Sequence, residues 1–471
     1  MNLGKKTKIV CTIGPVTENH DHLVQLVNAG MNVMRLNFSH GDFAEHQVRV
    51  DEIRKVMKKT GKTVAILQDL GGPKIRIGNF KDGTITLREG NIFTLTTDEV
   101  EGTEDRVSIN YPALPKEVKA GTIIMLHDGT KKLKVKEVKG NEIITEVMTG
   151  GHLSGHKGVN VPGANLSVHS LTEKDRADLE FGIKNKVDFV ALSFVRRASD
   201  ITELRAILDK RGLNARIIAK IETPEAVADF DNILAATDGV MVARGDLAIE
   251  IPTEDVPLVQ KMIIHKCNMI GKPVITATQM LESMIKNPVP TRAEVSDIAN
   301  AIIDGTDAIM LSEETTFGSF PVEAVKIMTR IANRVEKEVY TRDTIAEYAD
   351  SHGVTDVVSQ TAVRTAHAVN ASLIIALTRS GNTARMIARY RPAERILSLT
   401  DNPENVGSLM LTFGCYPMVV PTFNAVYEIM DVVRAAAIEN KVGKKGDKVV
   451  IVAGMPFGKA SETNMILVET L

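Results

Sequence analysis

The sequence has few cysteines, almost no net charge and no long apolar run, and each absence excludes a class of protein. Cys11, Cys267 and Cys415 are the only cysteines among 471 residues, and their spacing matches neither a disulfide framework nor a metal-ligand motif. The 57 basic and 59 acidic residues nearly cancel, so a formal charge of −2 argues against nucleic acid or a membrane surface as partner. We expect a reducing, cytoplasmic location.

Signals for membrane insertion or secretion are also missing. Nowhere do about 18 apolar residues follow one another, as a membrane-spanning helix requires. The start, Met1 to Lys8, is polar and basic with no apolar stretch behind it, so a secretion signal is not expected. The chain is too long for one compact core, and roughly two to four domains are expected.

Short β-branched runs alternate with helical patterns, an order typical of parallel strands joined by crossover helices. These runs predict a (β/α)₈ TIM barrel with strands at residues 7–13, 33–39, 64–70, 188–194, 216–222, 239–247, 273–279 and 308–312. The expected catalytic domain is discontinuous and comprises residues 1–70 and 158–340.

Two further domains are predicted. Residues 71–157 carry alternating segments such as Thr84–Leu87 and Lys132–Val135 between closely spaced turns, which indicates a small antiparallel β-barrel. Inserted at the C-terminal end of a barrel strand, it would cover the barrel mouth as a lid. A charged helical stretch, residues 330–350, would lead into a C-terminal α/β domain, 350–471, with strands at 373–378, 396–400, 418–421 and 448–453.

Two consecutive predicted strands end in ionisable residues. One apolar run leads to Lys220 and Glu222, and the next leads to Arg244 and Asp246. Because parallel barrel strands end at the same rim, a lysine and two carboxylates would converge there. The carboxylates can hold a divalent cation while Lys220 attracts an anionic substrate, as phosphoryl transfer requires. For any one residue, a structural ion pair is about equally plausible.

Five motifs, in this order, span almost the whole chain: MRLNFSHG at 34–41, KIE at 220–222, MVARGDL at 241–247, ATQML at 277–281 and NPVPTRAE at 287–294. Together they resemble the pyruvate kinase family. The resemblance implies the final step of glycolysis, in which the phosphoryl group of phosphoenolpyruvate passes to ADP to give ATP and, after protonation of the enol, pyruvate.

The resemblance also implies the role of each rim residue. Lys220 would neutralise the transferred phosphoryl group, and Glu222 and Asp246 would bind Mg²⁺ or Mn²⁺. Catalytic roles fall on Lys220, Thr278 and Arg35, and the implied substrate site comprises Arg35, Lys220, Ala243, Arg244, Gly245, Asp246 and Thr278. The hydroxyl of Thr278 is too weakly acidic to protonate the enol alone, so it would end a water or hydroxyl relay. Ser312, Glu313 and Glu314 are further candidates for that relay, although capping or ion pairing explains the glutamates equally well.

The implied nucleotide site lies at the rim of the barrel and at the hinges of the inserted domain. Its candidates are Asn37, Phe38, Ser39, His40, Arg76 and Lys157. Closing the lid would bring both hinge cations towards the nucleotide phosphates and exclude water.

One motif departs from the family pattern. Potassium-dependent members carry Asp-Thr-Lys-Gly-Pro-Glu, whereas this chain has Leu70 and Lys74 in the stretch that begins at Asp69. Leu70 lacks the hydroxyl that would bind the cation, and Lys74 supplies a fixed positive charge. We therefore expect weak K⁺ activation or none, with vestigial binding by Asn37, Ser39, Asp69 and Leu70 left open.

The C-terminal domain raises the question of regulation. Thr378, Ser380, Gly381, Asn382 and Thr383 lie between a strand and a helix and, by resemblance, would hold a phosphorylated effector; a simple helix cap is the alternative. The partner loop, residues 454–463, is less glycine-rich than in the family, and Glu462 would repel a phosphate. A homotetramer is implied, with residues 291–294 near a subunit contact.

Two other classes of function are considered. A related aldolase or mutase that acts on phosphoenolpyruvate or pyruvate would share Glu222 and Asp246 but would not need Arg76 and Lys157. A catalytically silent regulatory protein would have lost Lys220, Glu222 or Thr278, yet all are present. The kinase is therefore favoured.

Overall fold

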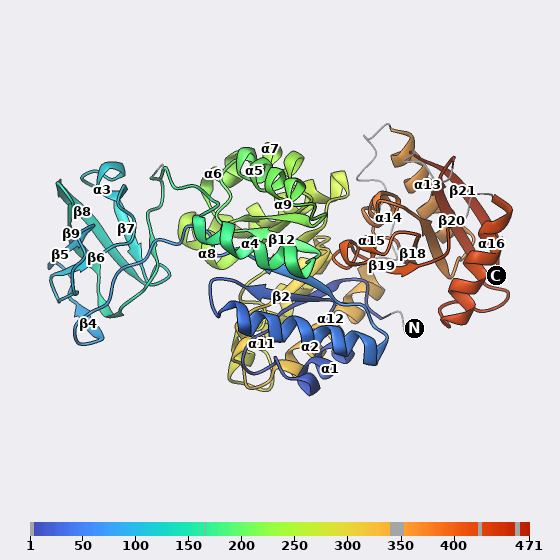
Figure 1. Cartoon of the computed structure of the whole chain (residues 1–471), viewed down its shortest axis with the longest axis horizontal. Helices are drawn as coiled ribbons and strands as arrows, with labels where there is room; N and C mark the ends of the chain where they lie inside the picture. The colour runs from blue at the N-terminus through green and yellow to red at the C-terminus, as the bar shows by residue number, and fades with distance from the viewer. Residues whose placement is uncertain (1–3, 165, 340–352, 423–425, 457–461) are drawn as a thin grey trace.

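The computed structural model describes residues 4–164, 166–339, 353–422, 426–456 and 462–471. The eight predicted strands form a closed parallel barrel in the order β1-β16-β15-β14-β13-β12-β3-β2. Their bounds are β1 Lys8–Thr12, β2 Val33–Asn37, β3 Ala65–Asp69, β12 Phe189–Leu192, β13 Arg216–Ile221, β14 Gly239–Ala243, β15 Val274–Ala277 and β16 Ala308–Leu311. The barrel occupies the middle of an elongated molecule, between the inserted β unit and the C-terminal unit (Figure 1).

Helices surround the barrel because its strands are apolar on both faces. One apolar layer, which includes Ile9, Leu36 and Ile221, lies between strands and helices, and a second, which includes Val10, Ile218 and Met241, fills the interior. The helices of this unit are α1 His20–Ala29, α2 Phe43–Thr60, α4 Glu173–Asn185, α5 Ala198–Lys210, α6 Pro224–Ala228, α7 Phe230–Ala236, α8 Arg244–Glu250, α9 Val256–Ile270, α10 Arg292–Ile303, α11 Glu313–Thr316 and α12 Pro321–Val339. Of the charged stretch 330–350, residues 330–339 belong to α12 and the others lie outside the described residues.

The unit inserted between β3 and β12 has its own apolar core, which includes Phe93, Leu95 and Leu133. Its strands form a six-stranded sheet, β11-β7-β8-β9-β5-β6, and a two-stranded sheet, β10-β4. All its strand pairs are antiparallel except β5 with β6, so the larger sheet is mixed. The bounds are β4 Thr84–Leu87, β5 Ile92–Thr96, β6 Arg106–Ser108, α3 Leu114–Glu117, β7 Ile123–Leu126, β8 Lys131–Lys139, β9 Glu142–Thr149, β10 Gly151–Ser154 and β11 Val159–Asn160.

The C-terminal unit is a five-stranded sheet, β19-β18-β17-β20-β21, with apolar clusters on both faces. Its elements are α13 Val354–Ala368, β17 Leu373–Leu377, α14 Asn382–Ala388, β18 Arg395–Thr400, α15 Glu404–Ser408, β19 Cys415–Val419, α16 Val426–Arg434, β20 Lys448–Gly454 and β21 Thr463–Thr470. Two predictions differ from the structure. The strand expected at 418–421 begins earlier, at Cys415, and β21, an antiparallel edge strand with many exposed positions, was not expected.

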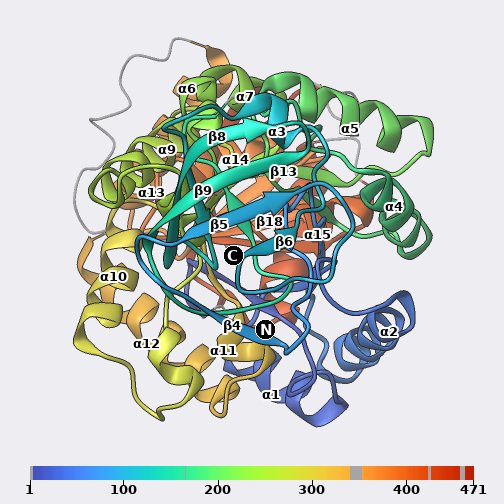
Figure 2. The same ribbon diagram turned by 90° about the vertical axis from the view of Figure 1, so that its left-hand side faces the viewer.

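The two smaller units cover opposite ends of the barrel. The inserted unit stands in front of the barrel when it is viewed from that end (Figure 2). At the other end, Met410 and Leu411 of the C-terminal unit join the apolar cluster of the barrel interior. The buried guanidinium of Arg391 also pairs there with Asp307 at 2.9 Å. The C-terminal unit therefore closes the foot of the barrel, and the mouth faces the inserted unit.

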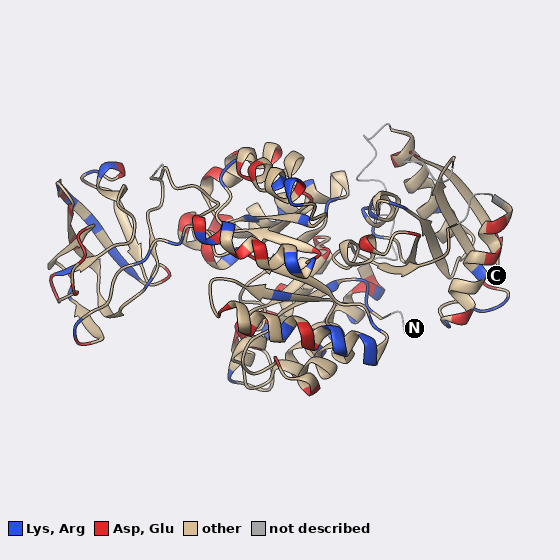
Figure 3. Cartoon of the chain, viewed as in Figure 1, with Lys and Arg blue, Asp and Glu red and all other residues tan. Residues whose placement is uncertain are grey.

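Along the ribbon, positions of Lys and Arg are interspersed with positions of Asp and Glu over the three units (Figure 3), in accord with the small net charge. Among the described residues, no helix has both the length and the apolar character needed to cross a membrane.

Candidate active site at the barrel mouth

Residues at the ends of several barrel strands converge at the mouth. Lys220 lies on β13, and Glu222 is the first residue after that strand. The next predicted strand, 239–247, was too long: β14 ends at Ala243, and α8 begins at Arg244. Arg244, Gly245 and Asp246 therefore form the first turn of a helix, where an acidic side chain is favoured by the helix dipole.

Lys220 is the centre of a buried ionic cluster. Its Nζ donates to Ser193 Oγ at 2.7 Å and lies 3.0 Å from Glu222 Oε1 and 3.4 Å from Asp69 Oδ1. Burial alone would lower the pKa of Lys220, but the charges of Asp69 and Glu222 outweigh it and raise the pKa above its usual value. The ammonium group is therefore held charged within an enclosed site.

Asp69 also joins Arg35 to this cluster. Arg35 Nε donates to Asp69 Oδ2 at 2.6 Å, and its Nη1 donates to Thr12 Oγ1 at 2.8 Å. Burial opposes ionisation of Asp69, yet Lys220 and Arg35 together lower its pKa. Two fixed cations thus share one buried carboxylate.

Glu222 is fully buried, and its Oε2 accepts a hydrogen bond from the backbone N–H of Phe194 at 2.6 Å. Burial raises the pKa of Glu222; Lys220 opposes this shift and the carboxylate of Asp246 adds to it. Glu222 Oε1 is buried and lies 3.0 Å from Lys220 Nζ. A buried carboxylate near a second carboxylate, that of Asp246, suits a divalent cation.

Arg244 and Thr278 fix the start of α8. Arg244 pairs with Asp297 at 2.7 Å and donates to the carbonyl of Thr278 at 2.7 Å. Thr278 has a φ of +68°. Its hydroxyl accepts from the N–H of Gly245 at 2.8 Å and donates to the Ala277 carbonyl at 2.6 Å. The amide of Gly245 is therefore already engaged with a side chain of the site.

Lys74 also faces the carboxylates. Its Nζ lies 3.8 Å from Asp246 Oδ1, and both side chains are about one-third exposed, at 33% and 28%. Leu70 instead packs, fully buried, in the apolar layer between the barrel and its helices. The two departures from the family motif thus lie in different surroundings.

Rim residues 37–40 differ in their access. Phe38 is 2% exposed and stacks on His46 with ring centroids 4.2 Å apart, and its backbone N–H and carbonyl are bonded to Asp69 and Lys174, so it offers no free group to a ligand. Asn37 Oδ1 accepts from the N–H of Ser39 at 3.2 Å, and Ser39 and His40 are exposed. Burial lowers the pKa of His40, and so do the nearby charges of Arg76, Lys74 and Arg35. Three cations from two segments, β2 and the hinge after β3, therefore gather around this histidine.

The two hinges of the inserted unit run side by side. The N–H of Ile77 donates to the Lys157 carbonyl at 3.0 Å, and the backbones of Arg76 and Gly158 form an isolated antiparallel β-bridge. The side chain of Arg76 also donates from Nη1 to the His156 carbonyl at 3.0 Å. This pairing brings the predicted nucleotide residues Arg76 and Lys157 together, near the mouth.

The candidate relay of residues 312–314 is rigid. Glu314 is 3% exposed and accepts backbone N–H groups of Ser312, at 2.7 Å, and Leu281, at 3.1 Å. These contacts favour the capping alternative for Glu314, whereas Glu313 is exposed.

The predicted effector loop lies in the C-terminal unit, away from the mouth. Thr378 follows β17, Gly381 has a φ of +81°, and Asn382 opens α14. Thr383 Oγ1 lies 2.8 Å from Thr463 Oγ1. In the partner loop Glu462 is exposed, and residues 457–461 lie outside the described residues. The segment predicted near a subunit contact forms the capping box of α10, in which Glu294 accepts the N–H of Thr291 at 2.7 Å.

Sequence reasoning missed three contributors: Ser193, Thr12 and the backbone of Phe194. It also assigned Asp69 only to a monovalent cation, whereas Asp69 pairs with both Arg35 and Lys220. Ser193 directly follows β12, so its place at a strand end was an available signal. The contacts of this cluster join residues from four barrel strands, and no local pattern showed them: Thr12 on β1, Arg35 on β2, Asp69 on β3 and Lys220 on β13.

Comparisons with known proteins show what the chain is similar to. The family model "Pyruvate kinase, barrel domain" matches residues 4–325, and "Pyruvate kinase, alpha/beta domain" matches residues 356–469. A pyruvate kinase of Geobacillus stearothermophilus is 50% identical over 99% of this chain and 80% of its own length, and one of Sporosarcina psychrophila is 47% identical with the same coverage. A crystal structure of a pyruvate kinase from Cryptosporidium parvum has a TM-score of 0.93 at 37% identity and covers 99% of this chain and 96% of its own. The chain belongs to the pyruvate kinase family.

Proposed function

We propose that this protein transfers the phosphoryl group of phosphoenolpyruvate to ADP, giving ATP and pyruvate. The observation that carries the proposal is the buried cluster in which Lys220 and Arg35 share Asp69 beside Glu222. A phosphoryl-transfer transition state is loose and carries its negative charge on oxygen, so catalysis depends on fixed positive charge in an enclosed site. The aldolase or mutase alternative is not supported by the family to which the chain belongs.

Lys220 and Arg35 would bind the substrate phosphate. Arg35 can donate two parallel hydrogen bonds to phosphate oxygens, and Lys220 would stabilise the charge of the group in transfer. Asp69 acts as a positioning residue, because it holds both side chains through its two carboxylate oxygens. Ala243, at the end of β14, and the first turn of α8, Arg244 to Asp246, would receive the substrate carboxylate.

Glu222 and Asp246 would hold Mg²⁺ or Mn²⁺. Among the described residues no cluster of three or more His, Cys, Asp or Glu side chains gathers as a metal site, so the substrate and water would supply the remaining oxygen ligands. When bound, the cation neutralises charge on phosphoryl and carboxylate oxygens. Among the protein groups, the N–H of Phe194 orients Glu222, and Lys74 balances the charge of Asp246.

Thr278 would position the proton donor for the enolpyruvate. Its hydroxyl is held between Gly245 and Ala277, and it has an unusual backbone conformation, which is common at functional sites. Asn37, Ser39, His40, Arg76 and Lys157 would receive the nucleotide. The gathering of cations around His40 supports binding of its phosphates.

The wider assignments are proposals of the same kind. The separate apolar cores support a barrel domain, 1–70 with 158–340, a lid domain, 71–157, and a C-terminal domain, 350–471. A homotetramer and a phosphorylated effector at residues 378–383 are inferred from resemblance to the family.

The test is pyruvate formation from phosphoenolpyruvate and ADP with Mg²⁺, first without potassium and then with it. We expect full turnover in both buffers, because Lys74 replaces the monovalent cation. Lys220→Met should reduce kcat by at least about 1,000-fold, since a buried charge that stabilises the transition state is lost. Turnover that requires K⁺ would overturn the role of Lys74, and no turnover in either buffer would overturn the activity.

A further inference from the structure

A second basic pocket lies at the opposite end of the barrel. It has a volume of about 150 Å³ and is lined by residues of both the barrel unit and the C-terminal unit. Arg216, Asp238 and Lys272 line it from the barrel, and Asn382 and Arg385 line it from α14.

The charges around this pocket do not balance. Four cations, Arg205, Arg216, Lys272 and Arg385, surround a single carboxylate, that of Asp238. Asp238 is already saturated: it pairs with Arg205, lies 3.2 Å from Arg216 and accepts the N–H of Ile217 at 2.8 Å. The four cations and one carboxylate leave a net charge of +3 around the pocket, and among the described residues neither Lys272 nor Arg385 pairs with a carboxylate.

These cations are also poorly solvated. Burial, and then the charge of Arg216, lower the pKa of Arg385 to about 10. Burial likewise lowers the pKa of Lys272. Lys272 Nζ donates to two carbonyls, those of Leu234 at 2.6 Å and Ala235 at 3.0 Å, and Arg385 Nη2 donates to the Ser380 carbonyl at 3.0 Å. An ammonium group has three N–H donors and a guanidinium group has five, so both side chains keep donors for a ligand. An anion would supply the missing charge.

We propose that this pocket binds a tetrahedral oxyanion, either inorganic phosphate or the phosphate group of a small phosphorylated metabolite, through Lys272 and Arg385. The pocket has room for a phosphate group. Guanidinium groups bind phosphate through paired hydrogen bonds, and phosphate carries about −1.5 charges at neutral pH.

Binding here would act on two functional segments. Arg216 opens β13, the strand that carries Lys220 at its other end. The same Arg216 donates to the Ser380 carbonyl, at 3.3 Å, as Arg385 does. An anion between these side chains would therefore link the loop predicted to bind an effector to an active-site strand.

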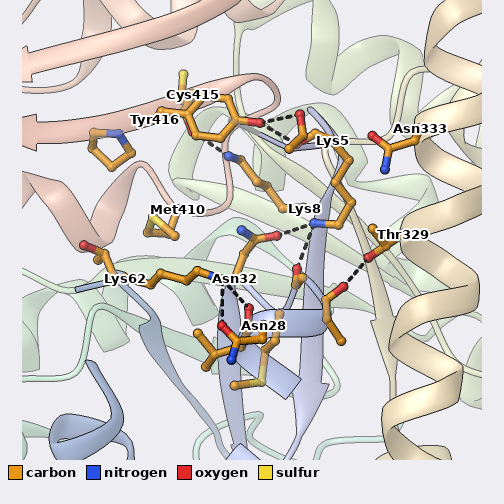
Figure 4. A pocket seen from close by; sticks show the side chains of 17 residues that line it. Lys5, Lys8, Asn28, Asn32, Lys62, Thr329, Asn333, Met410, Cys415 and Tyr416 are labelled. Atoms are coloured by element: carbon orange, nitrogen blue, oxygen red, sulfur yellow. Dashed lines mark hydrogen bonds between the residues drawn. The ribbon is translucent and has the colours of Figure 1, made fainter. Parts of the chain in front are cut away.

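A larger cavity of about 300 Å³ also lies at the barrel foot and contains Lys5, Lys8 and Lys62 (Figure 4). It has no guanidinium group in its lining, and each amine donates to a neutral oxygen: Lys5 to Asn32, Lys8 to the Cys415 carbonyl and Lys62 to Asn28. This cavity is a competing location for phosphate and forms one arm of the test.

The test is calorimetric titration of the full chain with inorganic phosphate, at an ionic strength held constant with chloride. We expect Lys272→Gln and Arg385→Gln to weaken phosphate binding at least tenfold. Asn382→Asp, an exposed substitution that leaves the fold intact, should weaken it similarly because it adds a negative charge at the pocket. The matched control is Lys266→Gln, which removes a partly exposed lysine of α9 that pairs with Asp231 outside the pocket.

Three outcomes would overturn the proposal. The first is the absence of phosphate binding by the unaltered chain. The second is equal binding by Lys272→Gln, Arg385→Gln and Asn382→Asp. The third is loss of binding on Lys62→Gln or Ser380→Ala with Lys272→Gln unaffected, which would place the anion in the larger cavity or in the effector loop. The readout is binding, so it does not depend on the proposed activity.

Discussion

Single residues decide the charge of the active site. Lys220 and Arg35 share Asp69, and Lys74 stands beside Asp246, so each carboxylate of the mouth has a cation near it. A monovalent cation would supply the same kind of charge as Lys74. The ammonium group differs in being covalently attached, so its local concentration does not depend on the buffer.

Lys74→Glu should make the enzyme potassium-dependent. The new carboxylate would repel Asp246, and only an added cation could offset that repulsion. We expect kcat in potassium-free buffer to fall at least tenfold, about 1.4 kcal/mol in activation free energy, and to recover largely with K⁺. The measurement is the pyruvate-forming rate at constant ionic strength. Lys81→Glu, at an exposed lysine of the inserted unit, serves as the control. Equal rates with and without K⁺ in Lys74→Glu would contradict the prediction.

Lys5 is predicted to make stability depend on pH. Burial, and then the charge of Lys8, lower the pKa of Lys5 from 10.5 to about 7. Between these values the unfolded chain binds one proton more than the folded chain, so the free energy of unfolding rises with pH; this contribution is complete above about 10.5 and is lost as pH falls to about 7. Relative to Lys5→Met, the unaltered protein should gain ~1 kcal/mol per pH unit from pH 7.5 to 9.5.

Chemical denaturation at several pH values measures this slope. Lys59→Met removes an exposed lysine of α2 and should leave the slope as it is. Parallel curves for Lys5→Met and the unaltered protein would show that Lys5 keeps its proton.

At the level of elements, the hinge between β3 and the inserted unit constrains the active site. Gly72 has a φ of +65°, and a Cβ there would lie 2.9 Å from Ser193 Cβ and 3.0 Å from Phe194 Cδ2. Ser193 accepts the hydrogen bond of Lys220, and Phe194 donates its N–H to Glu222. The hinge therefore packs directly against the residues that contact Lys220 and Glu222 of the proposed catalytic cluster.

Gly72→Ala should destabilise the fold by about 2 kcal/mol and lower kcat about tenfold, because Ser193 and Phe194 must shift. Gly83→Ala is a matched control, since Gly83 also has a positive φ, +75°, but meets nothing within 4 Å. Gly83→Ala should destabilise the fold only by the strain of an alanine at this positive φ, and it should leave kcat unchanged. Thermal unfolding and steady-state kinetics of both variants test this difference, and an equal loss of kcat in the two would contradict it.

Elements with a strong periodic pattern were predicted well. The eight barrel strands are buried on both faces, so each stood out as a continuous apolar run. The edge strand β21 was missed because half-exposed positions dilute that pattern, and β14 was predicted too long because MVARGDL gives no local sign that a helix begins at Arg244.

At the scale of the whole molecule, the C-terminal unit completes the barrel. Arg391 lies across the junction, pairs with Asp307 at 2.9 Å and also bonds Asn268 and the Gly305 carbonyl; it is 5% exposed. A buried ion pair of this kind contributes little net stability when intact, but removing one partner leaves an uncompensated charge.

Arg391→Met should therefore destabilise the protein by about 3–5 kcal/mol, because Asp307 would remain buried without its partner. The measurement is the denaturation midpoint of the full chain. Arg334→Met, which removes an exposed cation of α12 paired with Glu338, should leave the midpoint nearly unchanged. A similar midpoint for both variants would mean that water or another group replaces Arg391.

Local patterns were sufficient for the barrel, the insertion and the residues at the strand ends, because burial and strand periodicity depend on neighbours along the chain. They could not reveal the partners of those residues. The sharing of Asp69 by Arg35 and Lys220, the contact of Gly72 with Ser193, and the pair of Arg391 with Asp307 all join segments far apart in sequence. Charge and packing act through space, so only the tertiary structure could decide them.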